Sequence, residues 1–173
     1  MKSLRYQAAR LALGSLEAEE MKATVDSLMN EGFYAEECLA AMDASAHPRL
    51  DEVLPALRAA LEYHSVPVPS RDQAIRQLIE MHLTEIAAGV VDPVDGIKLL
   101  LEEVGWEDEF REGSKQYLGD AYGVERLVGF FYSAGTLKEP RPSAGSTPAP
   151  APAEDVGRAI KAEAEKWLTA NAT

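Results

Sequence analysis

Two residues that could do chemistry lie one helical turn apart on the most regular apolar stripe of the sequence. His82 and Glu85 are three positions apart, so a helix over this segment places them on one face. A histidine and a carboxylate can bind a metal ion or exchange a proton with a substrate. Di-metal helix bundles repeat a Glu-x-x-His motif and add two further carboxylates, whereas this chain holds no second copy. The pattern favours a core histidine, with a small metal-dependent or acid–base enzyme centred on His82 and Glu85 as an alternative.

The single cysteine, Cys38, follows Glu36 and Glu37. Neighbouring negative charge opposes a thiolate, so we expect a buried structural cysteine rather than a nucleophile. One cysteine forms neither an intramolecular disulfide nor a cysteine-based zinc site, and it is typical of the reducing cytoplasm. The sequence also lacks the motifs of serine hydrolases, zinc proteases and kinases. We therefore expect no cofactor, no bound metal and no catalysis.

Acidic residues gather around Trp106 within a short stretch of the sequence. Such a run is either a solvated surface or, with an aromatic side chain among the carboxylates, a site that binds a basic partner. The spacing of a calcium-binding loop is absent. Both interpretations stay open, and the second supplies the candidate site. This acidic cluster consists of Glu102, Glu103, Trp106, Glu107, Asp108, Glu109 and Glu112.

The whole chain is acidic, since its 173 residues carry 17 basic against 29 acidic side chains, a formal net charge of −12 at pH 7. Negative charge repels phosphate groups and anionic lipids, so we exclude nucleic acid and membranes as partners and expect a protein with a basic surface. The longest apolar stretches are far shorter than the roughly 20 residues that span a bilayer. Residues 1–137 hold 12 basic and 24 acidic side chains, whereas residues 138–173 hold five of each.

Apolar side chains recur at helical spacing along residues 1–137, and no segment alternates as a paired strand would. We therefore predict an all-α fold, a compact bundle of about six or seven short helices. Two helix starts are marked by their residue types, because Ser70 and Gln73 form a capping box and Asp92 precedes Pro93. The expected helices cover residues 1–14, 15–31, 34–44, 50–63, 70–89, 92–105 and 120–132, with a short helix or loop over 106–113.

The pattern also predicts which side chains point inward. In the helix expected over residues 34–44, Cys38, Leu39 and Met42 should face the core. Pro55 lies within the helix expected over residues 50–63, where it either kinks the helix or begins it as a first-turn residue.

The composition changes at residue 138. Residues 138–153 contain five of the ten prolines, which predicts a flexible, extended Pro/Ala linker. Residues 154–173 form an amphipathic helix, which needs a surface to pack on because an isolated helix of this length is marginal in water. Its own body, a second copy in a homodimer, or another protein could supply that surface. The residues expected to dock are Val156, Ile160, Trp167 and Leu168.

These observations favour a non-catalytic, cytoplasmic protein–protein interaction module with an acidic helical surface. One specific form is an inhibitor or immunity-type protein that neutralises a basic toxin or nuclease. Besides the enzyme centred on His82 and Glu85, a structural subunit that oligomerises through the helix over residues 154–173 is the remaining alternative.

Overall fold

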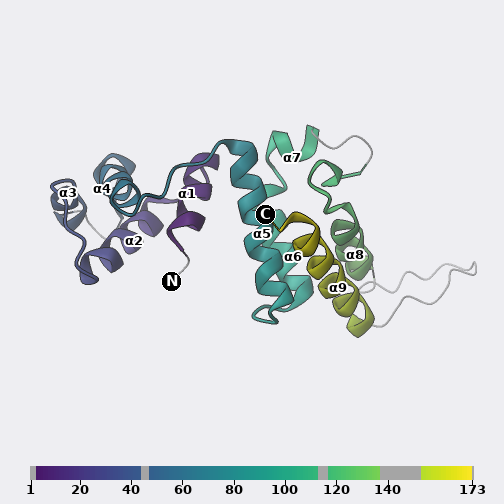
Figure 1. The fold of residues 1–173 in the computed structure, drawn as a ribbon. Coiled ribbons are helices and arrows are strands. Elements are labelled where there is room, and N and C mark those ends of the chain that lie inside the picture. The colour runs from purple at the N-terminus through teal and green to yellow at the C-terminus, as the bar shows by residue number, and fades with distance from the viewer. Residues whose placement is uncertain (1–2, 44–46, 113–116, 137–152, 173) are drawn as a thin grey trace, which may run out of the picture. The chain divides into compact units, whose positions relative to one another are not determined.

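The chain is all-helical over the residues that its structure, a computed structural model, describes: 3–43, 47–112, 117–136 and 153–172. Nine α-helices and one short 3-10 helix lie within these ranges, which contain no strand (Figure 1). The predicted all-α class is therefore confirmed. No helix in the same ranges combines the length and the apolar character needed to cross a membrane.

The contacts of the chain divide it into two compact units, Met1–Ala74 and Ile75–Thr173. The C-terminal helix belongs to the second unit. The predicted division into a body ending at residue 137, a linker and a tail stays a prediction, because residues 137–152 lie outside the described ranges.

The first unit is built from short helices whose ends are set by local hydrogen bonds. The backbone N–H of Tyr6 donates to the Ser3 hydroxyl at the first helix start. Gly14 ends that helix in the left-handed region, with φ at 75°. Pro55 lies inside the fourth helix, beyond its first turn, so it does not begin that helix. The helices are α1 (Leu4–Leu13), α2 (Ala18–Asn30), α3 (Cys38–Asp43) and α4 (Leu50–Tyr63).

The prediction for the inward face of the third helix is wrong in part. Cys38 is buried, but Leu39 and Met42 are 62% and 57% exposed. The helix begins at Cys38, four residues later than expected, and has six residues. A helix this short turns one narrow face toward the core. That face holds Cys38 and Ala41, which are three positions apart.

The remaining helices lie in the second unit, except that α5 (Arg71–Ala87) begins just before its boundary. The helix starts predicted at Ser70 and at Asp92 are both confirmed. The N–H of Gln73 donates to the Ser70 hydroxyl and the Gln73 side chain accepts from the N–H of Ser70, as a capping box requires. The Asp92 carboxylate accepts the backbone N–H groups of Val94 and Asp95. The elements are α5 (Arg71–Ala87), which begins in the first unit, α6 (Pro93–Val104), α7 (Asp108–Glu112), η1 (Asp120–Tyr122), α8 (Glu125–Thr136) and α9 (Ala153–Asn171).

The helix expected over residues 120–132 is two elements in the structure. Gly119 and Gly123 both adopt left-handed backbone angles, with φ at 86° and 70°. Such angles cannot continue a right-handed helix, so residues 120–122 form the separate turn η1. The α8 helix then begins at Glu125.

The C-terminal helix α9 packs against α6 and α8 of the same unit (Figure 1). Its buried residues recur every three or four positions and form one apolar stripe along the helix. This packing supplies the surface that an amphipathic helix lacks when isolated. The stripe consists of Val156, Ile160, Ala164 and Trp167.

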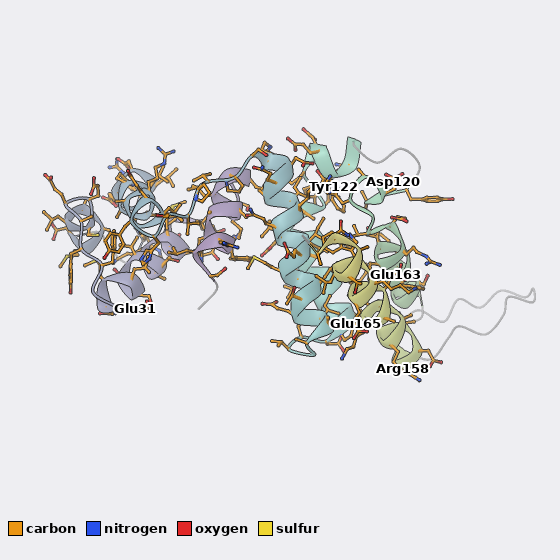
Figure 2. All side chains as sticks on the ribbon, in the orientation of Figure 1. Glu31, Asp120, Tyr122, Arg158, Glu163 and Glu165 are labelled. Atoms are coloured by element: carbon orange, nitrogen blue, oxygen red, sulfur yellow. The ribbon has the colours of Figure 1, made fainter. Side chains whose placement is uncertain are left out.

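Replacing Ile160 by alanine tests how much this stripe stabilises the second unit. Ile160 is fully buried, so the variant loses apolar contacts and leaves a cavity. We expect the free energy of unfolding to fall by about 2–4 kcal/mol, measured by urea denaturation followed by circular dichroism. Glu165→Ala, on the exposed side of the same helix (Figure 2), is the matched control and should change it by less than about 0.5 kcal/mol. An equal loss in both variants would contradict the packing of α9.

Candidate functional site

The acidic cluster lies where the chain leaves α6 and enters α7. The α6 helix ends at Val104, and the Gly105 N–H still bonds to the Leu101 carbonyl at 2.9 Å. A Cβ atom on Gly105 would lie 2.4 Å from that same carbonyl oxygen, so glycine is required for this ending. The Glu107 N–H then bonds to the Val104 carbonyl at 3.1 Å and closes a tight turn. This turn carries Trp106 between its ends.

Trp106 is the most exposed large apolar side chain among the described residues of the second unit, at 78%. Glu102 and Asp108 are exposed near it in the sequence, on the last turn of α6 and the first turn of α7. We call these three residues, Glu102, Trp106 and Asp108, the Trp106 corner. Glu107 and Glu109 are half-buried, and the side chain of Glu112 lies outside the described residues.

One exposed ion pair reaches this corner from within the described part of the chain. The Lys98 ammonium approaches the Glu102 carboxylate at 3.7 Å, with both side chains more than half exposed. An exposed pair of this kind contributes little to stability because water screens it. The carboxylate of Glu102 therefore stays available to a cation on a partner.

The α7 helix is anchored by Phe110, a residue that the sequence analysis did not single out. Its ring is fully buried and stacks on the ring of Tyr122, with centroids 5.6 Å apart and planes 17° apart. The Arg76 guanidinium carbon lies 4.9 Å from the centroid of the same Tyr122 ring. The only sequence signal for a buried role of Phe110 is that it is an aromatic residue among carboxylates. Trp106 has the same signal, so it does not distinguish the buried ring from the exposed one.

His82 is buried between α5 and α6, with its side chain 2% exposed. Its Nε2 atom lies 2.9 Å from the Oε2 atom of Glu103, so Glu103 is the carboxylate that the structure places against this histidine. The Glu103 side chain is 17% exposed, whereas the side chain of its neighbour Glu102 is 58% exposed. Glu85 is half-buried on α5. The pair therefore joins two helices in the interior of the second unit.

The His82–Glu103 pair has the polarity of a proton-transfer pair but a buried location. Its Nδ1 atom is buried and has no hydrogen-bond partner among the described residues. Within those residues no group of three or more histidine, cysteine or acidic side chains is arranged to hold a metal ion. What the geometry shows is a hydrogen-bond contact between α5 and α6 through a histidine side chain that is 2% exposed.

The predicted docking residues of the C-terminal helix lie in the second unit. Val156, Ile160 and Trp167 are buried, and Leu168 is half-buried. The Trp167 indole N–H donates to the backbone carbonyl of Tyr122 at 2.8 Å, and this bond is buried. The indole is therefore held by both packing and a directed bond.

A hollowed region lies on the first unit, beside α4. One groove of about 430 Å³ and another of about 310 Å³ share Arg58 and Glu62. The lining of the larger groove is mostly aliphatic and includes Leu11, Leu61 and Val66. Arg58 and Glu62 are the charged residues of the larger groove, and the smaller groove adds Glu37.

No family model, curated protein or solved structure matches the chain. The class of protein is therefore defined by its own fold and surface. It is an all-α protein whose second unit presents an exposed tryptophan beside carboxylates at a helix corner.

Replacing Glu103 separates a buried hydrogen bond from surface charge. Glu103→Leu leaves the His82 Nε2 atom buried without its partner, and we expect the free energy of unfolding to fall by about 1–3 kcal/mol. Glu103→Gln keeps an oxygen that can accept from Nε2 and should cost less. Glu102→Gln, the exposed neighbour, is the control and should stay within about 0.5 kcal/mol. Equal stability of the Glu103→Leu protein and the parent in urea denaturation would contradict a structural role for the pair.

Proposed function

We propose that this protein is a non-catalytic interaction module that binds a basic partner protein through the Trp106 corner. The observation that carries the proposal is the 78% exposure of Trp106 beside exposed carboxylates. Tryptophan is enriched among the residues that dominate binding energy at interfaces, because its large ring fills a pocket on the partner. The adjacent carboxylates would pair with lysine or arginine around that pocket.

The charge of the rest of the chain supports the same proposal. A net charge of −12 attracts a basic partner over the Debye length, about 10 Å at 0.1 M salt, and raises its rate of association. The apolar indole then supplies contact area at short range, where salt has little effect. In this proposal the acidic chain as a whole attracts the partner, and the Trp106 indole anchors it.

An inhibitor or immunity-type protein for a basic toxin or nuclease is the specific form that this chemistry favours. A surface that binds nucleic acid is rich in lysine and arginine, and carboxylates would compete with phosphate for it. A cytoplasmic location belongs to the proposal, since Cys38 is a buried thiol without a disulfide partner. A subunit that oligomerises through α9 and an enzyme centred on His82 and Glu85 stay alternative predictions.

A lysine–leucine amphipathic peptide is a suitable probe because it presents both cations and an apolar face. We expect the full chain to bind the labelled peptide saturably in fluorescence anisotropy, with a dissociation constant that rises at least about tenfold between low and high salt. Trp106→Ala should weaken binding by about tenfold or more at low salt. A salt-independent affinity, or no saturable binding, would contradict the proposal.

A pair of double variants separates the corner from net charge. Glu102→Gln with Asp108→Asn removes two charges at the corner, whereas Glu36→Gln with Glu37→Gln removes two exposed charges of the first unit. Both proteins have the same net charge. The corner variant should weaken peptide binding several-fold more than the control, and equal losses would show that the peptide responds to net charge rather than to this corner.

A further inference from the structure

The α7 helix cannot hold its own conformation. It has five residues, fewer than a helix needs for stability in water. Asp108 and Arg111 are exposed and Glu109 is half-buried, so Phe110 is the fully buried side chain among those described in this helix. Packing around the buried Phe110 ring therefore helps to fix the position of α7 and of the chain that enters it from the Trp106 corner.

That surrounding is the segment from Gly119 to Tyr122. The Tyr122 ring stacks on Phe110, and a Cβ atom on Gly119 would lie 3.2 Å from the Phe110 Cζ atom. The backbone thus passes close to the edge of the ring because position 119 has no side chain. A shift of Tyr122 would remove the stacked partner of Phe110 directly.

Tyr122 is in turn fixed by the C-terminal helix. The Trp167 indole N–H is the donor to the Tyr122 carbonyl, at 2.8 Å in a buried setting. A Cβ atom on the next residue, Gly123, would lie 3.6 Å from Trp167 Nε1, so the indole sits directly over this turn. A buried carbonyl that loses its donor is costly, so the bond holds the turn and α9 together.

We propose that Trp167 is a positioning residue for the Trp106 corner: packing of α9 fixes Tyr122, Tyr122 fixes Phe110, and Phe110 fixes α7. The C-terminal helix then controls the affinity of the acidic site, although it contributes no contact to the partner. This inference rests on the proposed function for its consequence in binding. Its structural part, the dependence of α7 on Trp167, stands by itself.

Trp167→Phe tests the inference because phenylalanine keeps an aromatic ring and removes the N–H donor. We expect faster amide hydrogen exchange over residues 106–111 in the full chain, measured by mass spectrometry, and a several-fold weaker affinity for the lysine–leucine peptide. Ile160→Val is the matched control, since it trims the same buried stripe at a residue whose side chain carries no hydrogen bond. Because it keeps the indole donor, its effects on the exchange and on the affinity should be much smaller than those of Trp167→Phe.

Phe110→Leu tests the other end of the same chain of contacts. It removes the stacked ring and should reproduce the faster exchange and the weaker affinity. Combined with Trp167→Phe, it should add much less than the sum of the single effects, because both act through Tyr122. Phe110→Leu with parental exchange over residues 106–111 would overturn the inference even if Trp167→Phe fails to fold.

The outcomes distinguish the inference from the proposed function. Unchanged exchange over residues 106–111 in a folded Trp167→Phe protein overturns the positioning role, whatever happens to peptide binding. Faster exchange with unchanged peptide affinity confirms the link from α9 to α7 but contradicts its control of the site. Failure of the unmodified chain to bind the peptide contradicts the proposed function and leaves the exchange result to decide the structural link.

Discussion

The hydrogen bond from the Trp167 indole N–H to the Tyr122 carbonyl is the directed contact that ties the C-terminal helix to the η1 turn. The η1 turn has three residues and lies between two glycines with left-handed backbone angles. A turn this short needs contacts with other elements to hold its position. The Trp167 indole N–H bonds to the backbone carbonyl of Tyr122 in this turn. The Tyr122 ring stacks on Phe110 and lies against the Arg76 guanidinium. Elements far apart in the sequence therefore converge on a single tyrosine.

The division of charge is consistent with this arrangement. The C-terminal helix packs through an apolar stripe, and its ion pair to α8, Glu163 with Arg126 at 3.5 Å, involves a largely exposed guanidinium (Figure 2). Such a pair contributes little to stability, so the packing of α9 should tolerate salt. Residues 1–137 hold 24 of the 29 acidic side chains, whereas the range that contains α9 is balanced in charge.

The sequence predicted those helix starts that depend on hydrogen bonds between neighbouring residues. The capping box of Ser70 and the start at Asp92 depend on residues within one turn, so the sequence was sufficient for them. The partner of His82 was not predictable in this way, because Glu103 lies 21 positions away and only the packing of α6 on α5 brings it near. Spacing drew attention to Glu85 instead. The anchoring role of Phe110 was missed for the same reason, since its partner Tyr122 belongs to a separate turn.

The two tryptophans show why exposure at position 106 is informative. Trp167 has a buried ring and a satisfied N–H, which is how a folded chain uses this residue for stability. Trp106 is instead 78% exposed, and acidic residues precede and follow it in the sequence. An indole that is this exposed in the folded chain contributes little to stability, because folding removes little of its apolar area from water. A corner that departs from the rules the rest of the unit follows is where a binding role is expected.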